Sequence, residues 1–246
     1  PSVVGQQASL VRYEVTLEPN NRNWLFALDA PVRVDDLPSG SALMMADMQL
    51  IARERIADRL RYRLESTTDY RFGMNETPAS LRNWLALPDG FNPKALELAR
   101  QWRDEEPDAQ RRVERVLRMF NRESFRYTMK PPLLGRDTVD DFLFGTRAGF
   151  CEHYASAFAV LMRAMDVPSR IVTGYQGGEA NTVDDFWVVR QADAHAWAEV
   201  WLDGRGWVRV DPTAAIAPER IERGARVLRR AARGAGEDLE LPVLDV

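Results

Sequence analysis

A long apolar segment near the middle of the sequence constrains the fold more than any other feature. Residues 151–165 carry apolar side chains on nearly every side of a helix, with Tyr154, Phe158, Leu161 and Met165 among them. A helix that is hydrophobic all round is buried in a protein core. Turn-forming residues follow this segment and end it. The sequence therefore predicts a buried central helix.

Short strands are predicted after this helix. Four segments rich in β-branched and aromatic residues follow it, at 170–175, 186–190, 196–202 and 207–211. We expect these strands to be antiparallel. A helix followed by antiparallel strands predicts a core of the α+β class.

Helical patterns also precede the buried helix. Asn92 can cap a helix that has Pro93 at its first position. A second helix carries an apolar stripe at helical spacing, made of Val113, Val116, Leu117 and Phe120. Thr138 and Asp141 have the spacing of a capping box, which predicts a short helix over 139–144.

The first third of the chain has the pattern of strands. Apolar and polar residues alternate from Ser9 to Leu17 and again from Arg59 to Leu64. We therefore expect a β-rich N-terminal domain over residues 1–88. This part contains neither His nor Cys, and we interpret it as a structural or docking module.

Helix- and strand-breaking residues mark the end of this domain at Leu87-Pro88-Asp89-Gly90. We expect the α+β core over residues 89–216. Residues 217–246 form a third part, in which arginines recur from Pro218 to Arg233 and predict a helix with a solvated face. A contact of this helix with anionic lipid or with another domain is the alternative.

Composition limits the classes of function. The formal net charge is −4, whereas nucleic-acid binding usually needs a basic surface, so no nucleic-acid partner is expected. No apolar run approaches the roughly 18 residues of a membrane helix. The chain begins with Pro1 and shows no signal-peptide pattern, as expected of an excised or processed segment.

The sequence holds one cysteine, Cys151, which excludes an internal disulfide and a multi-cysteine zinc site. A lone cysteine is more often a small buried hydrophobe than a nucleophile. Cys151, however, begins the buried helix, where unpaired N–H groups and the helix dipole favour a thiolate. Gly149 just before it leaves room for a substrate backbone, or serves as a plain turn residue.

His195 and Asp211 lie on the two strands of a predicted hairpin. A three-residue loop matches the facing side chains, with Glu199 opposite Arg209 as one example. In this register Asp211 faces Trp197. His195 is then the diagonal neighbour of Asp211 on the same face, at about 7 Å between Cα atoms. The carboxylate can therefore orient the imidazole.

Together, Cys151, His195 and Asp211 have the chemistry of a nucleophile, a base and an orienting carboxylate. His153 is a rival base, but side chains two residues apart on a helix do not face each other. We therefore expect His153 to be a polar residue of the first turn. Zinc held by the three candidate residues is a further alternative, which the lack of paired-ligand spacings disfavours.

Three motifs together resemble the transglutaminase-like superfamily. They occur in the family's order and spacing, at 147–155, 194–200 and 206–213. Within the superfamily, the sequence resembles the periplasmic domain of bacterial inner-membrane proteins of the transglutaminase protein A type, which are protein-glutamine gamma-glutamyltransferases. The resemblance implies a papain-like core. It also implies that Cys151 is the nucleophile, His195 the base and acid, and Asp211 the orienting carboxylate.

The resemblance suggests one more site residue. The family often places a side chain before the cysteine to stabilise the oxyanion, and Tyr127 is the candidate here. An aromatic residue at this point is more often part of the core. No metal, calcium included, and no cofactor is expected.

The function that the resemblance implies is acyl transfer from a protein glutamine carboxamide to a primary amine. Amide hydrolysis of a periplasmic or cell-wall substrate, by a cysteine protease or deamidase, is the alternative. A catalytically silent module that binds a peptide or polymer is an alternative of another class. The resemblance also implies a periplasmic location, with membrane attachment through segments outside this sequence.

Overall fold

The computed structural model describes residues 3–5, 10–181, 183–184 and 186–216. The described residues divide into two compact units, of which the first ends at Asn75 and the second begins at Glu76. The second unit thus begins before the boundary expected near residue 88. The Arg-rich segment that was predicted to be helical lies outside the described residues, as does the rest of 217–246.

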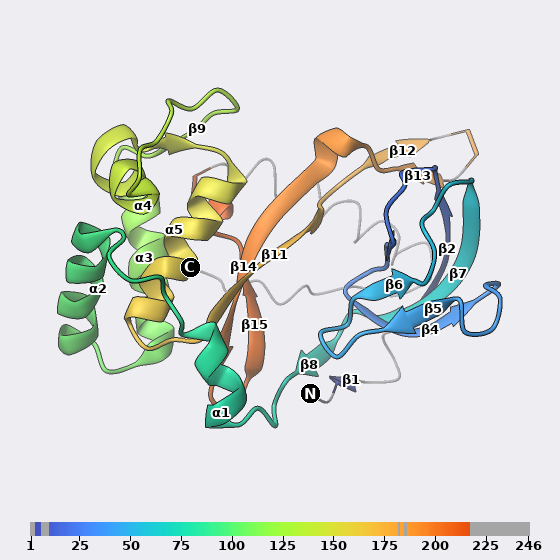
Figure 1. Cartoon of the computed structure of the whole chain (residues 1–246), viewed down its shortest axis with the longest axis horizontal. Helices are drawn as coiled ribbons and strands as arrows, with labels where there is room; N and C mark the ends of the chain where they lie inside the picture. The colour runs from blue at the N-terminus through green and yellow to red at the C-terminus, as the bar shows by residue number, and fades with distance from the viewer. Residues whose placement is uncertain (1–2, 6–9, 182, 185, 217–246) are drawn as a thin grey trace. The chain divides into compact units, whose positions relative to one another are not determined.

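The first unit is built from β-strands. They are β1 (Val3–Gly5), β2 (Leu10–Leu17), β3 (Trp24–Leu25), β4 (Ala30–Asp35), β5 (Ala42–Met44), β6 (Leu50–Ala52), β7 (Leu60–Thr67) and β8 (Tyr70–Phe72). One sheet has the order β2-β7-β4, a second has the order β3-β6-β5, and β1 pairs with β8 (Figure 1). The alternating segments of the sequence correspond to β2 and β7, so the β-rich N-terminal region is confirmed.

Apolar and polar side chains alternate along these strands, and the apolar ones form the core of the first unit. Its buried cluster comprises Leu25, Leu50, Ile56, Tyr62 and Leu64. The Tyr62 hydroxyl accepts the N–H of Phe26 at 2.9 Å and donates to the carbonyl of Phe26 at 2.8 Å. The buried polar group is thereby satisfied, as the interior of a stable unit requires.

The second unit contains helices and the other described strands. Its helices and helical turns are α1 (Pro78–Leu81), η2 (Arg82–Trp84), α2 (Pro93–Glu105), α3 (Ala109–Arg122), α4 (Thr138–Asp140), the π-helical turn η3 (Asp141–Thr146), α5 (Cys151–Ala164), η4 (Gln191–Asp193) and η5 (Pro212–Ala215). Its strands are β9 (Arg126–Tyr127), β10 (Ala148–Gly149), β11 (Ser169–Tyr175), β12 (Glu179–Asn181), β13 (Phe186–Val188), β14 (Ala194–Leu202) and β15 (Gly206–Val210). Figure 1 shows α2 to α5 gathered on one side of the sheet formed by β11, β14 and β15. In the described part of the chain, no helix is long and apolar enough to cross a membrane.

The second unit begins ahead of residue 88 because η2 and the residue pair after it contact elements that come much later in the chain. Trp84 of η2 lies edge-on to Trp207 of β15, with ring centroids 5.7 Å apart. The carbonyl of Ala86 accepts a hydrogen bond from Arg163 of α5 at 2.9 Å. These long-range contacts place the start of the unit ahead of the breaker residues.

Helix α5 is the centre of the core of the second unit. Its Tyr154, Phe158 and Leu161 have no exposed surface. The apolar stripe predicted on α3 is also buried, and Phe120 of that stripe packs edge-on to Tyr154 with ring centroids 5.4 Å apart. Burial of each such side chain contributes roughly 1.5–3 kcal/mol. The core therefore fixes the position of α5 and of its first residue, Cys151.

Two neighbouring helices exchange their capping groups. Asn92 is the N-cap residue of α2, but its side chain does not cap that helix. Instead, the Asp140 carboxylate accepts the N–H groups of Lys94 and Ala95 at 2.9 and 2.7 Å. The side-chain oxygen of Asn92 accepts the N–H of Val139 at 2.9 Å, at the start of α4. The exchange joins α2 to the segment that leads towards Cys151.

The predicted capping box of Thr138 and Asp141 is wrong. Asp137 is the N-cap residue of α4, and Thr138 is already the first helical residue. The Asp141 carboxylate accepts the N–H of Gly135 at 2.7 Å and so stabilises the preceding loop. The predicted short helix is present, as α4 continued by η3.

The central sheet has the order β11-β14-β15 and is antiparallel. The predicted hairpin register is confirmed, because Glu199 faces Arg209 and residues 203–205 form the connecting loop. The other face of β14 carries Ala198 and Val200, which are buried in one cluster with residues of α5. The strand predicted at 186–190 is present as β13, which pairs with β12 rather than with this sheet.

Candidate active site

Cys151 is the first residue of α5, and Phe150 holds the N-cap position in an extended conformation. The cysteine is only 8% exposed and packs with Ala155 and Ala196. The first N–H groups of a helix have no partner within the helix, and their dipoles favour negative charge. The fold thus places the thiol where a thiolate is stabilised.

Opposing effects act on the thiol of Cys151. Burial raises its pKa, because a thiolate loses hydration when it is buried. Hydrogen bonds from His195 and from the main-chain N–H groups of Ala196 and Glu152, together with the charge of His195, lower it. The net result is a pKa of Cys151 below the ordinary value of a thiol.

His195 and Asp211 form a buried hydrogen bond. The Nε2 atom of His195 is 2.6 Å from Oδ2 of Asp211, and the two side chains are 4% and 8% exposed. Burial lowers the pKa of His195, but hydrogen bonds to Asp211 and Cys151, with the charges of those groups, raise it to about 9. Because Nε2 faces the carboxylate, Nδ1 is the nitrogen available to the thiol.

Both oxygens of the Asp211 carboxylate have a partner. Asp211 follows β15 and is the N-cap residue of η5, and its Oδ1 accepts the N–H of Thr213 at 3.0 Å. Its Oδ2 faces His195. The turn after β15 therefore fixes the plane of the carboxylate, which in turn fixes the plane of the imidazole.

Tyr127 lies on β9, opposite Gly149 in the parallel pair of β9 and β10. This pairing brings Tyr127 to the strand that leads directly into Cys151. The Tyr127 ring packs against the buried core of the second unit, and its hydroxyl donates to the sulfur of Met129 at 3.5 Å. Its part in holding an oxyanion stays a prediction.

His153 packs among aromatic rings. Its ring centroid is 4.6 Å from that of Phe150 and 5.7 Å from that of Phe142. Burial lowers the pKa of His153, which favours a neutral imidazole. A Cβ atom on Gly149 would lie 2.6 Å from Cβ of His153. The space beside Gly149 is thus filled by His153, and this contact accounts for the glycine without reference to a substrate.

The described residues show no group of three His, Cys, Asp or Glu side chains placed as metal ligands. The candidate residues form a series instead, in which His195 bonds to Cys151 on one side and to Asp211 on the other. Such a series suits proton transfer rather than coordination of one ion.

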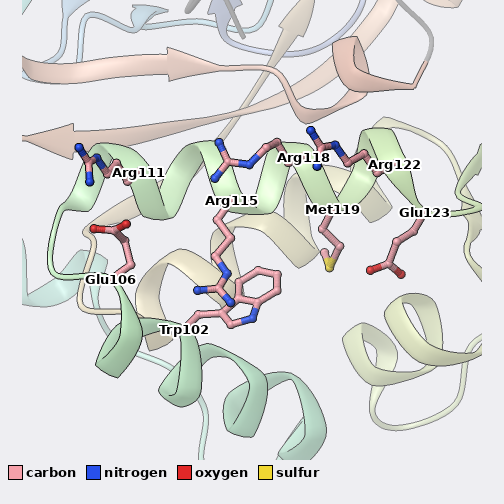
Figure 2. A pocket seen from close by; sticks show the side chains of 8 residues that line it. All are labelled: Trp102, Glu106, Arg111, Arg115, Arg118, Met119, Arg122 and Glu123. Carbon is pink, nitrogen blue, oxygen red and sulfur yellow. The ribbon is translucent and has the colours of Figure 1, made fainter.

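A hollow of about 380 Å³ lies between α2 and α3 (Figure 2). In this view Arg115 and Met119 of α3 point towards Trp102 of α2, and the Arg115 guanidinium lies 4.7 Å from the Trp102 ring centroid. The hollow is lined by other residues than Cys151, His195 and Asp211. It therefore does not belong to the candidate active site.

The three residues bring together a thiol at a helix N-terminus, an imidazole hydrogen-bonded to it and a carboxylate that orients the imidazole. These are the groups that cysteine-dependent acyl-transfer enzymes use. Here they lie where a buried helix packs on an antiparallel sheet, as in papain-like folds.

Comparison with known proteins identifies the family. Residues 96–212 match the transglutaminase-like superfamily, and residues 1–73 match the TgpA N-terminal domain. The crystal structure of the periplasmic domain of TgpA from Pseudomonas aeruginosa is similar, with a TM-score of 0.83 and 43% sequence identity. That similarity covers 89% of this chain and 74% of the TgpA chain. The chain belongs to the transglutaminase-like superfamily.

Two curated relatives are similar in sequence. The protein-glutamine gamma-glutamyltransferase of Pseudomonas aeruginosa is 43% identical over 229 residues, which are 93% of this chain and 33% of that protein. The uncharacterized protein YebA of Bacillus subtilis is 31% identical over 137 residues, which are 53% of this chain and 19% of that protein. The chain thus spans a third or less of the length of these relatives.

Sequence reasoning missed two main-chain groups of the site. The N–H of Ala196 reaches the thiol, and the N–H of Thr213 holds the carboxylate. Main-chain groups carry no sequence signal of their own. Trp197 was placed opposite Asp211 by the register but was given no role, although it adjoins His195 on the same face of β14.

Proposed function

We propose that the chain catalyses acyl transfer from a protein glutamine side chain to a primary amine, through a thioester on Cys151. The observation that carries the proposal is the buried hydrogen-bonded series of Cys151, His195 and Asp211. The name of the Pseudomonas aeruginosa relative supports glutamine as the donor group. The donor protein and the amine are proposed by class only.

The first half of the reaction forms the thioester. The Cys151 thiolate attacks the carboxamide carbon, and the C–N bond then breaks. His195, protonated in the resting pair, gives its proton to the departing nitrogen, which leaves as ammonia. The main-chain N–H of Cys151 stabilises the oxyanion, and the Tyr127 hydroxyl is the proposed second donor.

The second half transfers the acyl group. The amine attacks the thioester carbonyl while His195 accepts one of its protons. The C–S bond breaks and Cys151 leaves as a thiolate, which restores the ion pair with His195. Asp211 keeps the imidazole in the required orientation in both halves. Water in place of the amine would turn the same thioester into a carboxylate.

We place the chain in the periplasm, as a domain of an inner-membrane protein. The relative of known structure is a periplasmic domain. The match to the Pseudomonas aeruginosa enzyme occupies 33% of that protein, which has further segments. In this proposal, segments outside the present sequence attach the domain to the membrane.

The proposal is tested with a glutamine-containing donor protein and a labelled primary amine. Label incorporation and ammonia release are measured together for the wild type, for Cys151→Ala and for His153→Gln as the matched control. We expect both products from the wild type and the control and neither from Cys151→Ala. Ammonia release without incorporation, at saturating amine, would make the chain a hydrolase. Incorporation that survives in Cys151→Ala would overturn the proposal.

A further inference from the structure

An aromatic side chain adjoins the His195–Asp211 pair. Trp197 is the next residue after His195 on the same face of β14, and the two ring centroids are 6.3 Å apart with planes inclined by 23°. The pairing of β14 with β15 ends at Ala198 and Val210, and Trp197 and Asp211 are the residues immediately beyond that pair. Trp197 is thus a neighbour of both partners in the hydrogen bond, and it is only 8% exposed.

The indole of Trp197 is held from both neighbouring strands. The guanidinium of Arg209 on β15 lies 4.1 Å from the ring centroid, within the range of a cation–π contact. On β11, Gly174 is the register partner of His195. A Cβ atom at Gly174 would lie 2.9 Å from Cη2 of Trp197, so the indole occupies the space of the missing side chain.

Charged groups approach His195 from the elements around it. Cys151 comes from α5, Asp211 follows β15, and Arg209 of β15 lies across the indole. On β11 the residue opposite His195 is Gly174, which carries no charge. Glu199 follows Trp197 on this face of β14, and its carboxylate accepts a hydrogen bond from Arg170 at 2.7 Å. The group between His195 and Arg209 is therefore an uncharged ring.

We propose that Trp197 is a positioning residue, which fixes the plane of the His195 ring and keeps water from the His195–Asp211 hydrogen bond. Arg209 and Gly174 hold the indole in that place. A hydrogen bond shielded from water is stronger than an exposed one, because water does not compete for the carboxylate. A fixed ring also keeps Nδ1 directed at the thiol. The inference rests on the proposed role of His195 as acid and base.

The test uses alkylation of Cys151, which needs no substrate. Cys151 is the only cysteine in the sequence, so inactivation by iodoacetamide reports on this thiol alone. The rate is measured against pH for the full 246-residue chain. For Trp197→Leu we expect the midpoint of the profile to move up by about one unit and the rate near pH 7 to fall about tenfold. Trp197→Phe keeps an aromatic ring, and the midpoint of its alkylation profile is expected to lie between those of Trp197→Leu and the wild type.

Matched variants separate positioning from packing. Trp201→Phe makes the same exchange on the same face of β14, farther from His195, and its alkylation profile is expected to match the wild type. Gly174→Ala changes no charged group but displaces the indole, and is expected to shift the profile in the same direction as Trp197→Leu. Arg209→Gln is expected to slow alkylation about threefold, and Arg209→Lys to restore it, since a cation–π contact needs only the positive charge.

Turnover gives an independent readout. Because Trp197 acts through His195, Trp197→Leu is expected to lower kcat with KM unchanged. Thermal unfolding is followed for every variant. A folded Trp197→Leu with a wild-type profile would overturn the proposal, as would a lower Tm without any change in the profile. If Trp197→Leu does not fold, Gly174→Ala and Trp197→Phe decide in its place.

Failure of the proposed function has a different signature. If wild-type Cys151 reacts with iodoacetamide like an ordinary thiol, the ion pair with His195 is absent and the mechanism itself is contradicted. A second outcome is a wild type that shows an alkylation profile with a midpoint below that of an ordinary thiol and yet turns over no glutamine donor. In that case the proposed reaction is contradicted, but the ion pair is not. The role of Trp197 is then still decided by the profiles of its variants.

Discussion

At the scale of single residues, the reactivity of Cys151 is decided by the groups around it. Burial alone would raise the pKa of the thiol. His195 and two main-chain N–H groups reverse this effect, while Asp211 compensates for the burial of His195. The thiolate–imidazolium pair of the proposed mechanism therefore depends on the carboxylate, which does not contact the sulfur in that mechanism.

Asp211→Asn tests this dependence. The amide cannot accept the Nε2 proton with one oxygen and the Thr213 N–H with the other. We expect acylation to slow by as much as about 10⁴-fold, as when the orienting carboxylate of a serine protease is replaced by an amide. Ammonia release in a single turnover measures the effect, with Asp203→Asn in the exposed hairpin loop as the control. Unchanged turnover would remove Asp211 from the mechanism.

The same pair predicts a dependence of stability on pH. The pKa of His195 is raised to about 9 in the folded chain, against an ordinary value of 6.5. Its contribution is therefore fully present below about pH 6.5 and is lost as the pH rises through about 9. We expect Asp211→Asn to cost about 2 kcal/mol at pH 6 and progressively less above pH 7. Urea unfolding of both proteins across this range measures it, and a difference that grows with pH would contradict the assignment.

At the scale of elements, the site depends on α5 and on the hairpin of β14 and β15. The core around α5 fixes Cys151, and the hairpin register brings His195 to Asp211. The exchange of caps between Asn92 and Asp140 links α2 to the segment before β10. The sequence predicted the hairpin, because its facing side chains match in only one register. It did not predict the exchange, since the two partners are far apart in the chain.

Asp140→Ala tests the exchange. It removes the acceptor of two N–H groups at the start of α2, one in a buried and the other in a partly buried hydrogen bond. We expect a loss of about 1–2 kcal/mol in the free energy of unfolding, the usual cost of losing a helix cap. The matched control is Asp104→Ala, on the exposed surface of α2, which is expected to cost less than about 0.5 kcal/mol. Equal effects of the two variants would show that Asp140 is not the cap that stabilises α2.

At the scale of the whole molecule, the candidate active site lies in the second unit, which begins at Glu76. The sequence set the boundary near residue 88 because breaker residues are a local signal. The contacts of Trp84 with Trp207 and of Ala86 with Arg163 are long-range and leave no such signal. The candidate triad was predictable for the opposite reason, because each of its residues lies in a compact motif. The role proposed for Trp197 depends on its tertiary surroundings, so residue spacing alone did not predict it.

Two truncated chains test where the unit begins. A chain of residues 76–246 is expected to keep the alkylation profile of Cys151, because the described contacts of the site lie within it. A chain of residues 89–246 loses the partners of Trp207 and Arg163. We expect the Tm of this shorter chain to be lower than that of the 76–246 chain by at least about 4 °C. This difference corresponds to about 1–2 kcal/mol for a unit of this size. Equal Tm values would place the boundary at residue 88 after all.

The most direct test of the central claim is to isolate the thioester. The chain is mixed with a glutamine-containing peptide without amine, quenched in acid and analysed by mass spectrometry after digestion. We predict that the fragment holding Cys151 gains the mass of the peptide minus ammonia, and that hydroxylamine removes the adduct. Cys151→Ala should show no adduct. Ammonia release with the Cys151 fragment unmodified, or an adduct on another residue, would contradict acyl transfer through this thiol.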